Sequence, residues 1–244
     1  MDQQTKRELK QDHFVTSTGH GLEWASENRR SVIITTSILL AVIVLAVILG
    51  IVANRRSDAA AAAFGEAMQV YQTRLAVPGQ PKFPGEKLYA SANERALAAN
   101  ELFRSIADKY GSTKDGKNAR YFAGLTYLDA GQTQSAESTL QQVAGGWDRD
   151  LASLAKFALA DLYRQTGRDA QAIVLYNQLT DKPTAAVSAG LAQIQLAELY
   201  TKQGKSDLAH KIYAQLKDKD AKGVVGIIAA QKLNPSAAPT SPQL

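Results

Sequence analysis

Three glycines in the second half of the chain mark a repeating pattern of residues. Gly131, Gly167 and Gly204 lie 36 and 37 residues apart, each four residues after a tyrosine and five before an alanine. The other recurring positions are Tyr127, Tyr163 and Tyr200, then Ala136, Ala172 and Ala209, then Leu140, Tyr176 and Tyr213, and last Val143, Leu179 and Leu216. A period of this length is typical of helical solenoids, in which hairpins of two helices stack on one another.

The residues of one copy predict such a hairpin. Before each glycine, small and apolar residues recur three and four positions apart, as in Leu159, Ala160, Leu162 and Tyr163, which predicts a first helix. Glycine then enters the turn conformation that other residues adopt only at a cost. The alanine that follows lets the second helix approach the first closely. Because one hairpin cannot bury both of its faces, the copies are expected to stack.

A weaker copy precedes the three strong ones. Ala99, Phe103 and Ile106 stand 37 residues before their counterparts in the first strong copy, so residues 93–110 are predicted to be a second helix with residues 59–75 as its partner. The Pro- and Gly-rich residues 78–85 between them are either an insertion into this pair or a linker after a helix that continues from the N-terminal segment. Residues 224–233 are predicted to be a capping helix, and residues 234–244, with three prolines, a disordered tail.

The arrangement resembles the tetratricopeptide repeat over residues 117–217. Gly124, Ala160 and Ala197 match the small residue of that family's first helix, and the recurring tyrosines and alanines match its other consensus positions. The early tryptophan of the family is replaced by Arg120, Lys156 and Gln193, and its late proline is absent or shifted, as at Pro183. The resemblance implies an all-α solenoid whose first helices line a concave groove that binds peptides or partner helices.

The same resemblance implies which side chains line that groove. They are Asn118, Tyr121, Leu125 and Asp129 from the first strong copy, Phe157, Asp161 and Arg164 from the second, and Ile194, Glu198 and Lys202 from the third. Apolar residues with scattered charges suit a polypeptide ligand held by aromatic anchors and a few hydrogen bonds. The alternative is that Tyr121, Phe157 and Ile194 only pack between helices. A clamp of lysine and asparagine for a C-terminal carboxylate is not expected, because Tyr121, Leu125, Phe157 and Asp161 occupy those places.

An uncharged apolar run of 22 residues, from Val32 to Ala53, lies near the N-terminus. As a helix it is about 33 Å long, which matches a hydrocarbon core of about 30 Å. Residues 31–53 are therefore predicted to be a single transmembrane helix between an N-terminal tail, residues 1–30, and a repeat domain, residues 54–233. The alternative is a cleaved signal peptide, whose apolar region is usually shorter and closer to the N-terminus. Five basic residues in the tail favour a cytoplasmic N-terminus, although Arg55 and Arg56 flank the other end.

The composition does not favour an enzyme. Without cysteine, and with only His13, His20 and His210, the chain has few groups for a metal or for general-base catalysis, and it shows no Gly-rich phosphate loop or nucleophile elbow. We therefore expect no catalytic residues, cofactor or metal. The net charge of +5 contains no basic stripe interleaved with aromatic residues, so nucleic acid is not an expected partner.

Tail, apolar run and repeats together resemble the ancillary SecYEG translocon subunit family (YfgM-like) of bacterial inner membranes. That resemblance implies a cytoplasmic N-terminus, a periplasmic repeat domain, and translocon subunits and periplasmic chaperones as partners. Two alternatives share the layout: a membrane-tethered adaptor for another envelope complex, in cell division or secretion-system assembly, and an adaptor that faces the cytoplasm.

Overall fold

The computed structural model describes residues 28–77, 79, 85 and 87–234. In this part of the chain the regular elements are helices, apart from one isolated parallel bridge between Leu75 and Tyr89. The chain divides into two compact units, Met1–Arg56 and Ser57–Leu244, which are described separately. The predicted tails lie almost wholly outside the described residues, as do His13, His20 and most of the Pro- and Gly-rich stretch.

The first unit contains the predicted membrane segment. Helix α2 (Arg29–Gln72) includes the whole apolar run, and its only buried residues, Ala60 and Ala67, belong to the second unit. It is the one helix of the described residues that is long and apolar enough to cross a membrane. The predicted helix is thus present, and it continues past Ala53 without a break. The sequence from Ala59 to Ala63 favours this continuation because alanine has the highest helix propensity.

The second unit begins with the end of α2, which pairs with α3 (Ala92–Tyr110) as the weaker copy predicts. Phe64 of α2 lies with its ring centroid 5.6 Å from that of Phe103 in α3 and 5.5 Å from that of Phe122. The sequence left two possibilities for the segment between the helices, and both hold: α2 continues from the apolar run, and the segment is an insertion within a packed pair. A hydrogen bond of 2.8 Å from the amide of Ala76 to the carbonyl of Tyr89 joins the two ends of the insertion.

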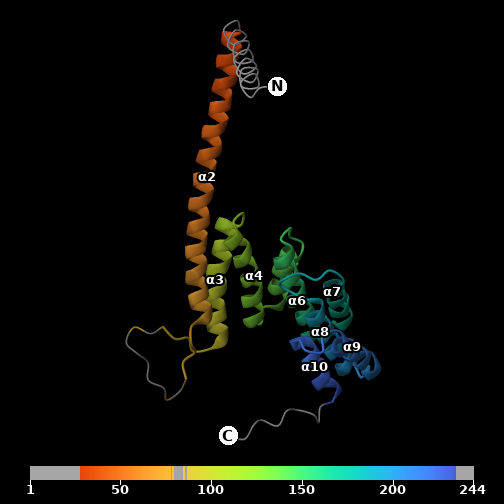
Figure 1. Ribbon diagram of the computed structural model, residues 1–244. Coiled ribbons are helices and arrows are strands. Elements are labelled where there is room, and N and C mark those ends of the chain that lie inside the picture. The colour runs from red at the N-terminus through yellow and green to blue at the C-terminus, as the bar shows by residue number, and fades with distance from the viewer. Residues whose placement is uncertain (1–27, 78, 80–84, 86, 235–244) are drawn as a thin grey trace, which may run out of the picture. The chain divides into compact units, whose positions relative to one another are not determined.

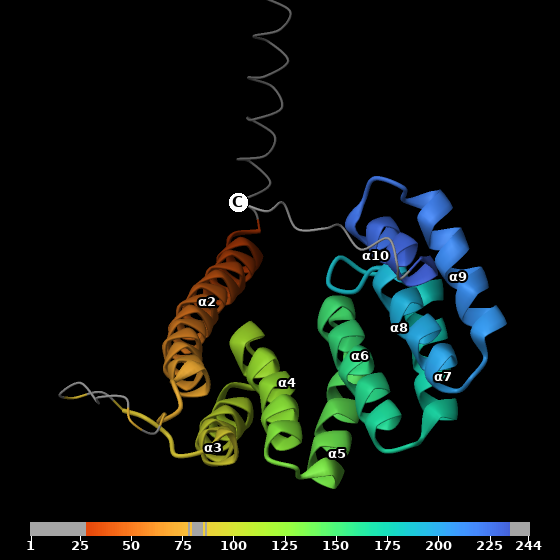
Figure 2. The same ribbon diagram turned by 90° about the horizontal axis from the view of Figure 1, so that it is seen from below.

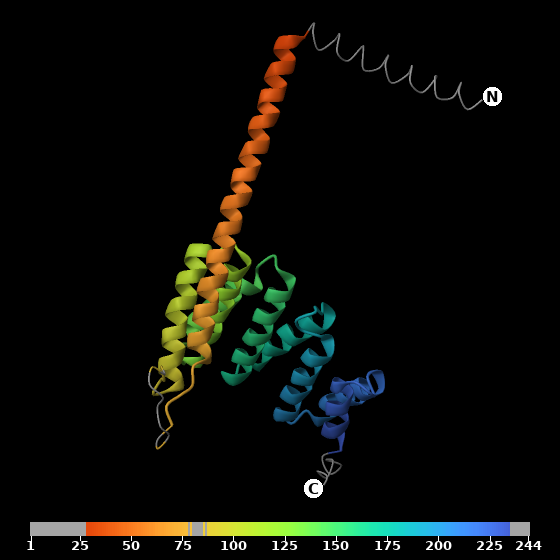
Figure 3. The same cartoon turned by 60° about the vertical axis from the view of Figure 1, so that its left-hand side comes forward.

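Three further hairpins and a single helix complete the second unit (Figure 1). They are α4 (Lys114–Asp129) with α5 (Thr133–Ala144), α6 (Arg149–Gln165) with α7 (Asp169–Asp181), α8 (Ala189–Lys202) with α9 (Ser206–Lys219), and α10 (Val224–Leu233). Each second helix also packs on the first helix of the next hairpin. From α4 to α9 the first helices lie on the inner side of a curve and the second helices on its outer side (Figure 2), and Figure 3 shows the stack from the side.

The turns within the three strong copies have one conformation. Gly131, Gly167 and Gly204 have φ of 73°, 73° and 74°, in the left-handed region where only glycine is free of strain. In each turn the amide after the glycine donates to the carbonyl of the recurring tyrosine, as Arg168 does to Tyr163 at 2.7 Å. This is the Schellman motif that ends many helices. The conserved spacing within the chain thus encodes one turn used three times.

Helix starts also follow a pattern. The helices α3, α4, α6 and α8 each begin with a side-chain cap. In each, the side chain of the capping residue accepts a hydrogen bond from an amide of the first turn; the caps are Ser91, Thr113, Asp148 and Ser188. The helices α5, α7 and α9 have none, because each starts directly after a glycine turn. Side-chain caps stabilise a helix start by about 1 kcal/mol. From α4 to α9, each first helix therefore begins at a side-chain cap and each second helix begins after a glycine turn; α3, which follows the insertion, begins at a side-chain cap as well.

The recurring small residues make room for the recurring large ones. Ala136, Ala172 and Ala209 are buried, and so are Leu140, Tyr176 and Tyr213. At Gly124, a β-carbon would lie 2.7 Å from Cδ2 of Leu140, which is closer than carbon atoms approach. Glycine at position 124 therefore lets α4 and α5 pack closely.

A polar network also joins the second and third hairpins. The carboxylate of Glu137 in α5 accepts hydrogen bonds from the Tyr163 hydroxyl, at 3.0 Å, and from Arg168 Nη1, at 2.8 Å. The guanidinium of Arg168 also lies 4.4 Å from the centre of the Tyr163 ring. These contacts connect α5 to the turn between α6 and α7.

Candidate protein-binding groove

All ten residues predicted to line a groove lie on α4, α6 and α8, the helices on the inner side of the curve in Figure 2. Within each helix most of them are three or four positions apart, so they share a face. Asp129 and Lys202 are exposed, Ile194 is buried, and the rest are half-buried. The face they form is therefore continuous over three hairpins and partly accessible.

The large apolar members of this set pack between helices. Tyr121 and Phe157 contact the central core cluster, and the Phe157 ring centroid lies 6.0 Å from that of Tyr176 in an edge-on arrangement. Part of the surface of both proposed aromatic anchors is thus already used within the fold, although both residues stay partly accessible. Ile194 is only 5% exposed and belongs to the core formed with α9 and α10. For Ile194 the structure therefore favours the alternative that its side chain only packs between helices.

The acidic members of the set are paired within the fold. Asp129 accepts a hydrogen bond of 3.0 Å from the hydroxyl of Tyr71 in α2, and Asp161 forms an ion pair with Arg164. Glu198 forms an ion pair of 2.7 Å with Lys232 of α10. These contacts hold the carboxylates in fixed positions and neutralise part of their charge. Sequence spacing did not indicate them, because Tyr71 is 58 residues from Asp129 and Lys232 lies outside the repeats.

The pKa shifts on this face reflect the same contacts. Burial, followed by the nearby charge of Asp129, raises the pKa of Tyr71 from 10.0 to about 12. Hydrogen bonds to Asp161 and Glu198 raise the pKa values of Arg164 and Lys232 respectively. Each of these groups therefore stays protonated at neutral pH.

Within the described residues, no group of three histidine, aspartate or glutamate side chains could hold a metal ion. His210 is exposed on α9, on the outer side of the curve. The inner face itself combines partly accessible aromatic rings, aliphatic side chains and fixed charges. This is the chemistry of a surface that recognises polypeptides.

A further exposed feature lies outside the predicted groove. The turn between α5 and α6 contains Gly145, Gly146 and Trp147, and the Trp147 side chain is fully exposed. Two cavities, of about 330 and 180 Å³, flank this turn, and Gly146 lines both. None of the ten predicted groove residues lines either one. The sequence does contain a signal for this feature, because Trp147, the largest kind of side chain, directly follows two glycines in a turn.

Stacked helical hairpins, a repeated glycine turn and an inner face of mixed polarity define a helical-repeat domain that binds proteins. The family model of the tetratricopeptide repeat-like domain matches residues 23–235. The chain therefore belongs to the tetratricopeptide repeat-like family, whose domains are typically non-catalytic. Comparisons with curated proteins and with solved structures found no match.

Proposed function

We propose that this protein is a membrane-anchored scaffold that binds other proteins at the bacterial inner membrane. Residues 31–53 span the bilayer, the N-terminal tail lies in the cytoplasm, and the repeat domain lies in the periplasm. The observation that supports this most is the composition of α2, whose apolar part has no buried residue and is continuous with the repeat domain. An exposed apolar surface of this length is stable in lipid and not in water.

The proposed partners are subunits of the Sec translocon and periplasmic chaperones. An anchor keeps the repeat domain attached to the membrane in which emerging chains and translocon subunits are found. Such a tether raises the local concentration of partners without any additional contact. The inner face, with Tyr121, Leu125 and Phe157 partly accessible, is proposed to hold extended or helical segments of those partners.

Topology is the first test. A phosphatase that is active only in the periplasm and a fluorescent protein that folds only in the cytoplasm are fused in turn after Leu244. We expect phosphatase activity without fluorescence, and the reverse result would favour an adaptor that faces the cytoplasm. Alkaline extraction of membranes, with the mass of the recovered chain, separates an anchor from a cleaved signal peptide. An intact chain in the membrane pellet is expected.

The inner face is tested by crosslinking in intact membranes. A photoreactive amino acid replaces Leu125 on α4 or Lys202 on α8, and the control replaces Val174, which is exposed on α7 at the outer side. These substitutions avoid fully buried side chains, so the fold is retained. Crosslinks to translocon subunits or chaperones from the two inner positions, and not from the control, are expected. Division or secretion proteins at the same positions would favour another envelope complex, and equal labelling at all three positions would contradict an inner-face site.

A further inference from the structure

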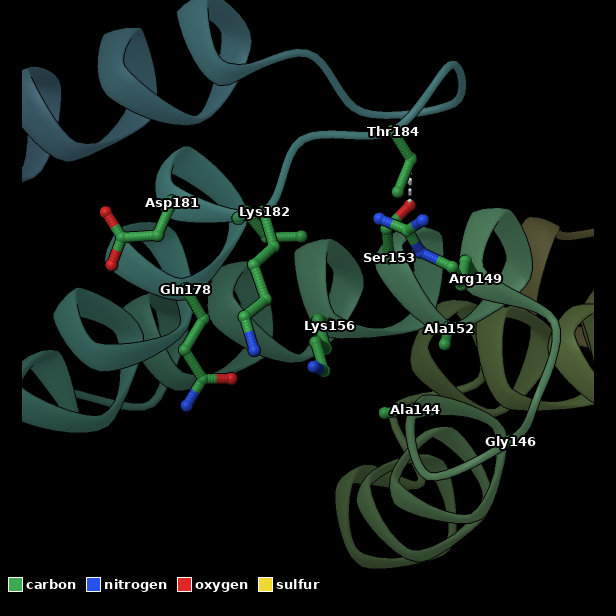
Figure 4. A pocket seen from close by; sticks show the side chains of 11 residues that line it. Ala144, Gly146, Arg149, Ala152, Ser153, Lys156, Gln178, Asp181, Lys182 and Thr184 are labelled. Carbon is green, nitrogen blue, oxygen red and sulfur yellow. Dashed lines mark hydrogen bonds between the residues drawn. The ribbon is translucent and has the colours of Figure 1, made fainter.

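A second surface, separate from the inner face, lies around the turn between α5 and α6, residues 145–148, and we call it the edge. The larger cavity at this edge, of about 330 Å³, lies between the end of α5, the start of α6 and the end of α7 (Figure 4). The smaller one, of about 180 Å³, lies between the start of α4, the end of α5 and Trp147. The turn at Gly146 separates them. A ligand of several residues is therefore needed to occupy both.

Positive charge predominates in the walls of these cavities. Arg149, Lys156 and Lys182 line the larger one together with a single carboxylate, Asp181. Figure 4 shows the Lys182 side chain extended toward the side of Lys156, with the Asp181 carboxylate on the other side of Lys182. The cavity is thus lined by three cations and one carboxylate.

The smaller cavity continues this pattern. Its charged lining residues are Lys117, Arg120 and Asp148, and the Asp148 carboxylate already accepts a hydrogen bond of 3.1 Å from the amide of Leu151. Five cations thus face two carboxylates over the two cavities. None of the five takes part in the ion pairs formed within the described residues. Charge complementarity therefore favours an acidic ligand.

The edge also offers apolar contacts. Trp147 is fully exposed beside the smaller cavity, whose wall includes Val143 and Leu151, and Leu179 lines the larger cavity. An indole ring is a large apolar surface with one hydrogen-bond donor, and such rings frequently anchor protein interfaces. A small inorganic anion would leave this apolar surface uncovered. An acidic polypeptide that also carries an apolar side chain fits both kinds of wall.

Hydrogen bonds fix the wall of the larger cavity. The hydroxyls of Ser153 in α6 and Thr184 are 2.7 Å apart, and Thr184 Oγ1 accepts a hydrogen bond of 3.2 Å from the amide of Val187. The segment between α7 and α8 is thereby attached to α6. Because these hydrogen bonds already hold the wall in place, little conformational entropy is lost there when a ligand binds, which favours affinity.

We propose that this edge binds an acidic polypeptide segment in an extended conformation. Its carboxylates contact Arg149, Lys156 and Lys182, and an apolar or aromatic side chain packs on Trp147. The site is independent of the proposed inner-face site, so a partner can occupy both surfaces at once.

The test uses the full chain in nanodiscs of phosphatidylcholine. The probe is a fluorescently labelled, blocked ten-residue peptide with one phenylalanine among glutamates, and its control has glutamine in place of every glutamate. We expect anisotropy to show binding of the acidic peptide only, with an affinity that falls as salt is added. The double variant Lys156→Glu with Lys182→Glu is expected to bind at least about tenfold more weakly.

Two controls make the result decisive. The double variant Lys211→Glu with Lys217→Glu changes the net charge equally at exposed positions of α9 outside both cavities and the inner face, and it is expected to bind as the parent does. Circular dichroism checks that each variant folds, and a Lys156→Gln variant replaces the charge reversal if it does not. Equal weakening by both double variants, or no binding of the acidic peptide, would overturn the proposal.

A contact with anionic lipid is the competing result. It is tested in nanodiscs that contain phosphatidylglycerol, with Trp24 replaced by phenylalanine so that Trp147 is the remaining tryptophan. A blue shift of Trp147 emission in these nanodiscs, with no response to the acidic peptide, would show that the edge contacts the membrane and would overturn the proposal. A blue shift with the peptide in phosphatidylcholine alone is the expected outcome.

Discussion

The contact between Gly124 and Leu140 predicts that one substitution changes the sign of its effect when a second is present. Glycine to alanine in a helix interior usually stabilises by about 1 kcal/mol. At position 124 the new β-carbon would lie 2.7 Å from Cδ2 and 2.8 Å from Cγ of Leu140, which is fully buried in the central core. Overpacking of this kind costs about 1–3 kcal/mol. We therefore expect Gly124→Ala to lower the free energy of unfolding by about 1 kcal/mol.

Removal of the opposing side chain should reverse this effect. Leu140→Ala alone creates a cavity and costs about 2–5 kcal/mol. In that background the clash at position 124 is absent, so Gly124→Ala should stabilise by up to about 1 kcal/mol through helix propensity. The coupling between the two positions is then about 1–3 kcal/mol, which is well above the deviation from additivity of independent sites.

The assay is urea unfolding of the full chain in detergent micelles, followed by circular dichroism at 222 nm and extrapolated linearly. Gly65→Ala serves as the matched control. Gly65 is exposed within α2, and a β-carbon there would meet no atom within 4 Å, so this substitution should stabilise by about 1 kcal/mol in both backgrounds. Equal shifts for Gly124→Ala and Gly65→Ala in the parent chain, or no coupling to Leu140, would refute the reasoning.

Three further predictions concern the turns, the tyrosines and the network between hairpins. Gly167→Ala should destabilise by about 1–2 kcal/mol in the same urea assay although no atom opposes its β-carbon, because φ of 73° is strained for alanine; an unchanged midpoint would contradict this. Burial raises the pKa values of Tyr71 and Tyr176 from 10.0 to about 12, so both stabilise the fold fully below pH 10 and less as the pH rises through 12. Unfolding free energies at pH 9 and pH 11 should therefore fall more for the parent than for a variant with phenylalanine at both positions, and equal losses would argue against the shifts. Glu137→Ala removes the acceptor of the network between the second and third hairpins and should cost about 1–2 kcal/mol by urea unfolding, and an effect near zero would show that the network does not couple them.

Most of the architecture follows from short-range patterns. Glycine at positions 131, 167 and 204 predicts the turns because the left-handed backbone conformation of these turns favours glycine over other residues. This preference is local, so the sequence alone reveals it. The apolar run and the alanine-rich segment after it predict a helix, but not that one helix would serve both the anchor and the first hairpin. The alanines favour a continuous helix, but the position of its second half in the first hairpin depends on the packing of Phe64 against Phe103 and Phe122, about 40 and 58 residues later.

The candidate site was less predictable than the fold. Repeat register places Phe157 and Ile194 at equivalent positions, yet Phe157 is half-buried and Ile194 is covered, since the last hairpin is closed by α10. The pairing of Asp129 with Tyr71, and of Glu198 with Lys232, likewise joins distant parts of the chain. The exposure of Trp147 also depends on the three-dimensional course of the turn. A single sequence shows which residues recur, and tertiary packing decides which of them reach the surface.

The hydrogen bond between Ala76 and Tyr89 has a consequence for how this chain can vary. Since it closes the insertion at its base, the number of residues beyond it has little influence on how the helices on either side pack. The entropy lost on closing a loop rises only slowly with its length. Relatives can therefore gain or lose residues at this place, or accept a whole inserted module, while the register of every later hairpin is preserved.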